Sequence, residues 1–147
     1  MVATRAPSDP AREAWAAIAD LFFGDEGHDR FHDAGDAVEL SPPALKALLS
    51  LDPGEAKPMR VLAGQWRCDA SWVTSLADTL EERGFVERRI LPADRRVKTI
   101  VLTDAGAKAK ERALERLHQP PAAIAALSAT EQRQLRDLLR KVADPPA

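Results

Sequence analysis

The stretch from residue 58 to residue 102 constrains the fold of this chain more than any other part of the sequence. It predicts a short helix over 58–66, opened by a proline, and a second helix over 69–83. Asp69 is a favoured N-cap residue at the start of the second helix, and Gly84 is a favoured residue just past its end. Because so few residues separate the two helical patterns, a tight turn is expected between them.

Two β-rich segments follow this helix pair. Residues 85–90 and 97–102 are rich in β-branched and apolar side chains, and they flank a turn-forming segment at 91–96. The pattern predicts an antiparallel hairpin. Two helices joined by a tight turn and followed by a hairpin form the layout of a winged helix-turn-helix, in which the hairpin is the wing.

The rest of the chain is mostly helical in pattern. Helices are expected over 9–23, 41–51, 103–117 and 128–142, whereas residues 24–40, rich in Gly, Asp and His, are expected to form a loop or a frayed continuation. The 147 residues, 45% of them hydrophobic, suffice for a single compact domain over 1–147. The predicted fold class is therefore mainly α with a small β-hairpin wing, and its winged helix-turn-helix part, residues 41–102, is the candidate for nucleic-acid binding.

Charge is distributed unevenly along the chain. The formal net charge is −2, yet residues 1–56 hold four basic and 11 acidic residues, and the remainder holds 17 basic and 12 acidic ones. The stretch 83–98, which includes the predicted hairpin turn, holds six basic residues and two acidic ones. Local positive charge of this kind can neutralise phosphates, although a solvated hairpin with assorted surface charges remains an alternative.

Several functional classes are not expected. The N-terminal residues contain no apolar core of a signal peptide, and no apolar run is long enough to span a membrane. Cys68 is the single cysteine, so no intramolecular disulfide can form, and a cytoplasmic location is expected. No phosphate-binding loop, metal-protease motif or assigned nucleophile is present, so we expect no catalytic site, no metal site and no cofactor.

The helix predicted over 69–83 has two contrasting faces. At about 100° per residue, its apolar residues fall on one face of the helix and its small polar residues fall on the other face. The apolar face consists of Val73, Leu76, Ala77 and Leu80, and the polar face of Ser71, Thr74, Ser75 and Asp78. Short hydroxyl side chains allow a helix to approach base edges in a major groove. An ordinary amphipathic surface helix has the same pattern, so this helix alone does not decide the matter.

The predicted hairpin carries two adjacent arginines. Asp94, Arg95 and Arg96 are expected at its tip, where an arginine can enter a minor groove while the ribbon follows the DNA backbone. Asp94 is expected to orient an arginine and not to touch DNA, because phosphates repel a carboxylate.

Four ordered motifs resemble the multiple antibiotic resistance regulator (MarR) family. They are CDASxVT at 68–74, LExRGFVER at 80–88, DRRVK at 94–98 and LTxxG at 102–106, where x marks positions that do not contribute to the resemblance. The resemblance covers about residues 41–142. It implies a triangular homodimer on double-stranded DNA, with dimerisation helices drawn from 9–33 and 103–142.

The resemblance also implies roles for particular residues. Major-groove contacts fall at Ser71, Trp72, Thr74 and Ser75, and a minor-groove contact falls at Arg96, supported by Asp94 and Arg95. Asp69 and Lys98, at the edges of these motifs, complete the set of candidate DNA-binding residues.

The chain departs from the family pattern at four positions. Arg67 stands where the family usually has glycine in the turn between the two helices, and a non-glycine residue there costs about 1 kcal/mol if the backbone is left-handed. Trp72 is larger than the usual residue; it can stack on a sugar, meet a thymine methyl group or pack elsewhere. Leu91 replaces an acidic residue, and Gly64 is expected to weaken the first helix of the pair.

Other residue groups have a functional and a structural interpretation. His28 and His32 could bind zinc from one helical face, but a solvated acidic loop is favoured. Cys68 could be a redox switch, although a structural thiol is favoured. Trp15, Phe22 and Phe31 could line a ligand-binding cleft, but core or dimer-interface positions are the favoured interpretation.

Two hypotheses follow. The first is a homodimeric DNA-binding transcriptional regulator, a repressor on a pseudo-palindromic operator, with a small-molecule effector as a further partner. The second is a winged-helix module that docks a protein partner, motivated by the acidic N-terminal third and by Trp72, since tryptophan is a common interface anchor.

Overall fold

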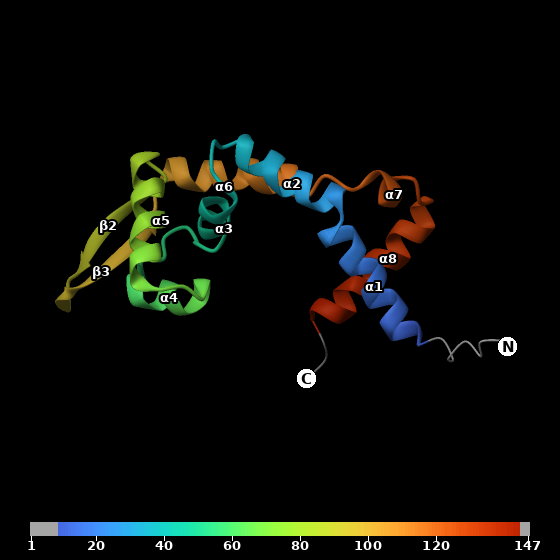
Figure 1. Cartoon of the computed structure of the whole chain (residues 1–147), viewed down its shortest axis with the longest axis horizontal. Helices are drawn as coiled ribbons and strands as arrows, with labels where there is room; N and C mark the ends of the chain where they lie inside the picture. Colours follow the sequence, from blue (N-terminus) through green and yellow to red (C-terminus); the bar gives the residue numbers. More distant parts are fainter. Residues whose placement is uncertain (1–8, 145–147) are drawn as a thin grey trace, which may run out of the picture. The chain divides into compact units, whose positions relative to one another are not determined.

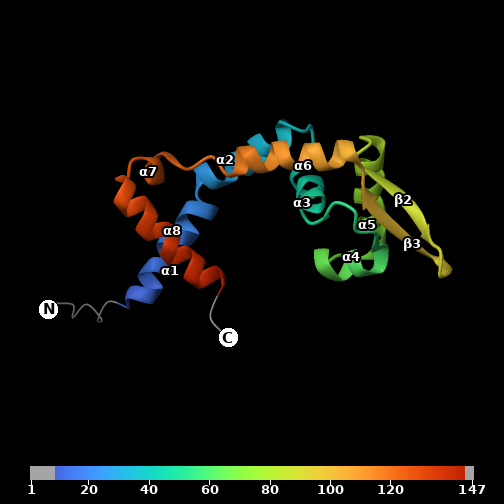
Figure 2. The ribbon, with the colours of Figure 1, turned by 180° about the vertical axis from the view of Figure 1, so that it is seen from behind.

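The computed structural model describes residues 9–144 (Figures 1 and 2). The chain divides into two compact units, one ending at Leu117 and the other beginning at His118. The first unit contains the winged helix-turn-helix part and three further helices, and the second contains two helices. Within the described residues no helix is long and apolar enough to cross a lipid bilayer.

The first two helices of the first unit are α1 (Pro10–Phe23) and α2 (Asp25–Asp36). Asp9 caps α1 as predicted, because its carboxylate accepts a hydrogen bond from the backbone N–H of Ala11 at 3.1 Å. The expectation of a loop at 24–40 was wrong for most of this segment. Gly35 of α2 allows a close backbone contact instead of flexibility, since a Cβ atom there would lie 2.6 Å from the carbonyl oxygen of Leu40.

The winged-helix part matches the predicted order of elements. It consists of α3 (Pro42–Leu49), β1 (Lys57–Pro58), α4 (Met59–Trp66), α5 (Ala70–Glu82), β2 (Val86–Leu91) and β3 (Asp94–Leu102). The sheet is antiparallel with the order β1-β3-β2, so the wing has a third strand that sequence patterning did not predict. The two residues of β1 are too few to show the alternation that identifies a strand.

The predicted apolar faces converge on one core. The predicted inward face of α5 is buried, and Leu45 and Leu48 of α3 are fully buried as predicted, while Leu49 is half-buried. Leu62 of α4 and Ile100 of β3 complete the centre of this core. The core therefore fixes the backbone of α5 while its polar side faces outward.

The long helix α6 (Asp104–Leu117) leaves the wing and runs alongside α2, as both views show (Figures 1 and 2). Thr103 precedes it as the predicted cap, and its hydroxyl oxygen accepts a hydrogen bond from the backbone N–H of Gly106 at 3.0 Å. Arg116 near its end forms an ion pair with Asp33 of α2 at 3.6 Å. The wing and α2 are thus both packed against one helix.

The second unit consists of α7 (Ala122–Ala125) and α8 (Ala129–Ala143). The predicted capping box is present, since Ser128 and Glu131 exchange hydrogen bonds between side chain and backbone at the start of α8. No residue of α8 is buried, and its apolar residues Leu138 and Val142 are 62% and 75% exposed.

Replacing Gly64 with alanine is expected to stabilise the chain by about 1 kcal/mol, since glycine costs about that much in a helix interior. Gly64 lies inside α4, and a Cβ atom built there meets nothing within 4 Å. Urea denaturation of the wild type and the variant checks this. A variant that is less stable than the wild type would show that the open space at Gly64 is occupied in solution.

Candidate nucleic-acid interface

The N-terminus of α5 is held by one carboxylate. Asp69 accepts hydrogen bonds from the Ser71 hydroxyl at 2.6 Å and from the Trp72 backbone N–H at 2.8 Å. The hydrogen bond from Ser71, and to a smaller extent the one from Trp72, holds the pKa of the Asp69 carboxyl below its usual value, so the group stays ionised. Asp69 therefore acts as a helix cap and fixes the orientation of Ser71.

The outward side of α5 carries the polar residues that the sequence predicted. Ser71, Thr74 and Ser75 are all exposed, and the Thr74 hydroxyl donates to the backbone carbonyl of Ala70 at 3.0 Å. The Trp72 side chain is 48% exposed, so it packs partly on the domain and partly faces solvent. The structure thus places all four predicted major-groove residues on or beside one exposed surface.

The turn before α5 keeps a left-handed backbone even though it lacks glycine. Arg67, the C-cap residue of α4, has φ 51° and ψ 48°. The left-handed turn is therefore kept, although a non-glycine residue in this conformation destabilises it by about 1 kcal/mol.

The wing has a tighter tip than predicted. Its turn is formed by residues 92–93, and Leu91 lies opposite Asp94, whereas the next pair is Ile90 opposite Lys98. Residues 95–97 have no opposite residue in β2, so they form a bulge that bends the strand. The predicted tip arginines thus lie on this bulge, beside the turn and not in it.

Asp94 holds the bulge through the backbone. Its carboxylate accepts a hydrogen bond from the backbone N–H of Arg96 at 3.0 Å. The sequence predicted that Asp94 would orient an arginine. The bond found here orients the main chain of Arg96 and leaves its guanidinium group available.

A groove lies between α5 and the wing. It has a volume of about 490 Å³ and is lined by residues of α4, α5 and β3, including Arg60, Ala70, Thr74, Asp94, Arg96 and Lys98. It brings Thr74 of the predicted helix surface together with Arg96 and Lys98 of the predicted wing surface. Arg60 was not among the predicted residues, because a single exposed arginine on a short helix has no distinguishing sequence signal.

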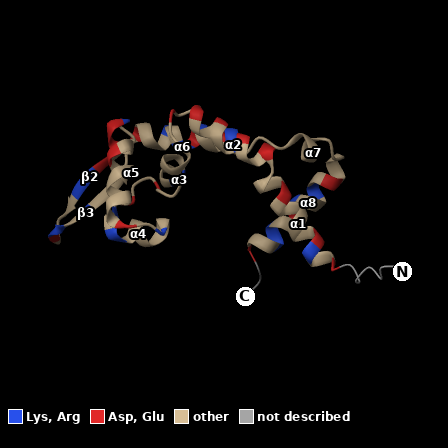
Figure 3. Cartoon of the chain, in the orientation of Figure 1, with Lys and Arg blue, Asp and Glu red and all other residues tan. Residues whose placement is uncertain are grey.

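Ion pairs neutralise half of the basic residues at 83–98. Arg83 pairs with Glu39, Arg88 with Asp78 and Glu81, and Arg89 with Glu87. No ion pair is found for Arg95, Arg96 or Lys98 within residues 9–144. Figure 3 shows basic residues along the hairpin and at its end. The uncompensated positive charge of this stretch therefore lies on β3, next to the groove.

Comparisons with known proteins agree with this geometry. The family model of the MarR family matches residues 40–98. A protein described as an uncharacterised HTH-type transcriptional regulator, YwaE of Bacillus subtilis, is 32% identical over 106 residues, which are 71% of this chain and 62% of that protein. The chain is therefore similar to the MarR family over residues 40–98, and it spans about 62% of the length of this curated relative.

Solved structures of MarR-family proteins share the fold. Apo MarR from E. coli has a TM-score of 0.70 and 22% identity, with 95% of this chain and 100% of that chain covered. CouR from Rhodococcus jostii RHA1, solved with p-coumaroyl-CoA bound, has a TM-score of 0.57 and 27% identity, with 98% and 99% covered. The chain therefore has the winged-helix fold of these structures, which confirms the predicted fold class.

Arg88 joins the wing to α5. Its guanidinium group contacts the Asp78 carboxylate, the Glu81 carboxylate at 2.9 Å and the Thr74 carbonyl oxygen at 3.4 Å. The bond to Asp78 in particular raises the pKa of Arg88 further above its usual value. Arg88 was counted in the sequence only as one basic residue, since a contact between a strand and a helix is not visible in local patterning.

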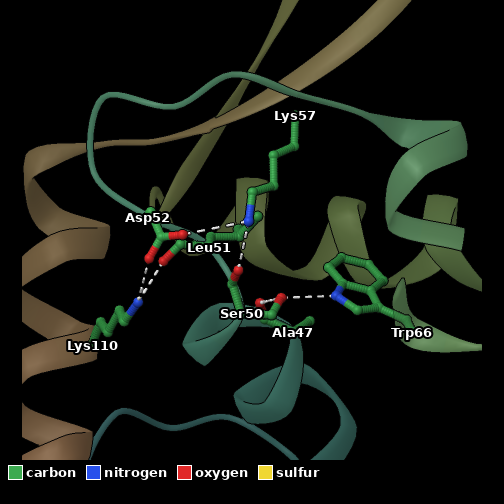
Figure 4. Close-up of polar contacts among 7 residues, drawn as sticks. All are labelled: Ala47, Ser50, Leu51, Asp52, Lys57, Trp66 and Lys110. Carbon is green, nitrogen blue, oxygen red and sulfur yellow. Dashed lines mark hydrogen bonds and ion pairs between the residues drawn. The ribbon is translucent and has the colours of Figure 1, made fainter. Parts of the chain in front are cut away.

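The C-terminal end of α3 is held by donors from three other elements (Figure 4). The Lys110 ammonium group of α6 donates to the Leu51 carbonyl at 2.6 Å, and the Lys57 ammonium group of β1 donates to the Ser50 carbonyl at 3.1 Å. The Trp66 indole N–H of α4 donates to the Ser50 hydroxyl at 2.7 Å. These bonds fix the helix pair relative to α6 within the first unit.

Asp52 adds a pH-dependent element to this cluster. Its carboxylate oxygens lie 3.5 Å from the ammonium groups of both Lys110 and Lys57. The charge of Lys110, followed by that of Lys57, holds the pKa of the Asp52 carboxyl below its usual 3.8. A lowered folded-state pKa stabilises the fold above the unfolded-state value, and this contribution is lost as pH falls through the folded-state value.

We therefore expect Asp52→Asn to be less stable than the wild type at pH 7 and to approach it as pH falls below about 4. Urea denaturation of both proteins between pH 7 and pH 3 measures the difference. Lys110→Met, which removes the main partner, should reduce the effect of adding Asp52→Asn. A difference that stays constant across this range would show that the carboxylate charge at Asp52 does not stabilise the fold.

An apolar pocket of about 350 Å³ lies on the other flank of α5. Phe31, Trp66, Trp72 and Leu76 line it, together with Pro42, Pro43, Ala47 and the side chain of Lys46. Of the three aromatic residues predicted as ligand-binding, only Phe31 lines this pocket. Trp15 and Phe22 lie on α1, where they are 67% and 72% exposed.

The remaining candidate residues lie apart from these surfaces. His28 and His32 are exposed on α2, with ring centroids 4.5 Å apart, and the described residues contain no group of three or more side chains that could hold a metal ion. Cys68 is half-buried and packs against the core.

Proposed function

We propose that this chain is a homodimeric, sequence-specific DNA-binding regulator of transcription. In each subunit α5 lies in the major groove, and the bulge of β3 places Arg96 in the adjacent minor groove. The observation that carries the proposal is the groove between α5 and the wing, where Thr74 of α5 lies together with Arg96 and Lys98, which form no ion pair within the described residues. Proteins that bind duplex DNA usually place basic side chains beside a helix that fits the major groove.

Exposed apolar surface supports the homodimer. On α1, Trp15, Phe22 and Phe23 are 67%, 72% and 86% exposed, and on α8 apolar residues are exposed as well. Large apolar residues grouped on one helix indicate an interaction surface. The proposed dimerisation helices lie within 9–33 and 103–142, so that the two units of each chain act as one MarR-like domain.

A two-fold axis gives the proposed operator its form. Two copies of α5 related by this axis would read a pseudo-palindrome with half-sites about 34 Å apart. A repressor would occupy such an operator until a small effector favoured a different spacing of the two helices. The apolar pocket beside Trp72 is a suitable place for an effector, and the p-coumaroyl-CoA bound to CouR shows that one relative of this fold binds a small molecule.

Selection of tightly bound fragments from a random duplex pool tests the proposal. We expect enrichment of one pseudo-palindromic sequence, with a dissociation constant at least 1,000-fold lower than that of a scrambled duplex at physiological salt. Recovery of unrelated sequences after repeated rounds would contradict sequence-specific binding.

A second candidate function is docking of a protein partner through Trp72. The half-exposed Trp72 indole beside an apolar pocket resembles the anchor residues of protein interfaces. Under this alternative, DNA binding would be non-selective and abolished by moderate salt, and Trp72→Ala would leave the weak DNA binding unchanged.

A further inference from the structure

Helix α5 lacks the side chains that usually read guanine and adenine. From Ala70 to Glu82 it contains no Arg, Lys, Asn, Gln or His. Arg and Lys read guanine through its O6 and N7 acceptors, and Asn and Gln read adenine through one donor and one acceptor. Bidentate contacts of either kind are therefore unavailable to this helix.

The hydroxyl protons of α5 are largely committed to the protein itself. Ser71 donates to the Asp69 carboxylate at 2.6 Å, and Thr74 donates to the Ala70 carbonyl at 3.0 Å. Each hydroxyl oxygen keeps lone pairs that can accept a hydrogen bond. Toward the DNA, Ser71 and Thr74 thus present acceptors, which suit the amino groups of cytosine and adenine and not the acceptors of guanine.

The same surface carries negative charge. Asp69 and Asp78 are acidic, exposed and close to the reading positions, and Arg88 compensates only Asp78. A carboxylate repels the electron-rich O6 and N7 edge of guanine, and it favours amino groups.

Apolar groups complete the surface. The 48% exposed Trp72 side chain lies on one flank of α5, and Thr74, whose hydroxyl proton is donated to the Ala70 carbonyl, adds a methyl group on the other. The C5-methyl group of thymine is the one apolar group that a base pair presents in the major groove, and apolar side chains recognise it.

We infer that α5 specifies its half-site through thymine methyl groups and base amino groups, without reading guanine. This inference rests on the proposed function and names the base chemistry that the same surface recognises. Trp72 and Thr74 are its specificity-determining residues, and the wing is not involved, because it approaches the minor groove.

Base analogues that change only the major groove test this directly. In the duplex selected from the random pool, each thymine of the half-sites is replaced in turn by uracil, and each guanine by 7-deazaguanine. We expect uracil under α5 to weaken binding about fourfold for each methyl group removed. Replacement of guanine by 7-deazaguanine should change the dissociation constant less than twofold.

Two variants connect the effect to named residues. Thr74→Ser keeps the hydroxyl and removes the methyl group, and Trp72→Ala removes the indole; each should bind the natural and the uracil-containing duplex with more similar affinity than the wild type does. Thr79→Ser, which removes the same methyl group from an exposed position of α5 outside the predicted DNA-binding residues, is the matched control and should keep the full uracil effect.

The outcomes separate this inference from the proposed function. The inference is overturned if 7-deazaguanine weakens binding of the selected duplex more than tenfold, or if uracil leaves the affinity unchanged at every thymine. Specific DNA binding would still stand in either case. A pool without any enriched sequence would contradict both.

Discussion

Replacing Arg96 with alanine is expected to weaken operator binding about 100-fold. Arg96 lies on the bulge of β3, its backbone is fixed by Asp94, and no ion pair within the described residues competes for its guanidinium group. A charge-assisted hydrogen bond contributes about 1.5 kcal/mol, and a symmetric dimer loses two of them. Each 1.4 kcal/mol is tenfold in affinity.

The salt dependence gives an independent check on Arg96. The slope of log K against log salt should become shallower by about 0.9 for each phosphate that is no longer neutralised, or about 1.8 for the dimer. Arg96→Lys should keep the slope and lose part of the affinity, because lysine retains the charge but not the planar fork. Arg112→Ala, which removes an exposed cation of α6, is the matched control and should change little. Unchanged affinity and slope in Arg96→Ala would remove the wing from DNA binding.

Replacing Gly106 with alanine is expected to destabilise the chain by about 3 kcal/mol, the upper end for an overpacked site. A Cβ atom at Gly106 would lie 1.9 Å from the carbonyl oxygen of Phe85. That carbonyl also accepts a hydrogen bond from the Thr103 N–H at 3.0 Å, so it cannot move without breaking the junction between wing and α6. The close approach accounts for the glycine at the end of the motif at 102–106.

Urea denaturation measures this effect, and Gly64→Ala is its matched control. The two substitutions are chemically identical and both lie in helices, but only one of them meets a backbone atom. Opposite signs are therefore expected. A Gly106→Ala variant within about 0.5 kcal/mol of the wild type would mean that the first turn of α6 is not packed against Phe85.

Much of the fold could be predicted because its patterns are local. The cap at Asp69, the apolar spacing of the helix behind it, and the capping box at Ser128 each depend on neighbouring residues, and all three are present in the structure. Helix α2 was missed because glycines that permit close backbone contacts resemble glycines of a flexible loop. A helix such as α2 and a flexible loop can have the same composition, and only the backbone that packs against the glycines distinguishes the two.

The candidate interface was less predictable, because ion pairs between distant residues decide its charge. The stretch 83–98 is basic in sequence, but Glu39, from the turn between α2 and α3, neutralises Arg83, and carboxylates of α5 neutralise Arg88. Within the described residues, the cations of this stretch that form no ion pair therefore all lie on β3, which no count of charges along the chain can show. The bulge that separates Arg95 and Arg96 from β2 depends likewise on the pairing of two strands.

Sedimentation of the purified chain with its selected duplex tests most directly whether two copies bind one operator. The expected result is two chains on each duplex, together with tight binding that weakens steeply as salt rises and a scrambled duplex that remains largely free at physiological salt. A chain that sediments as a monomer and binds the selected and scrambled duplexes equally would contradict a symmetric pair of reading helices.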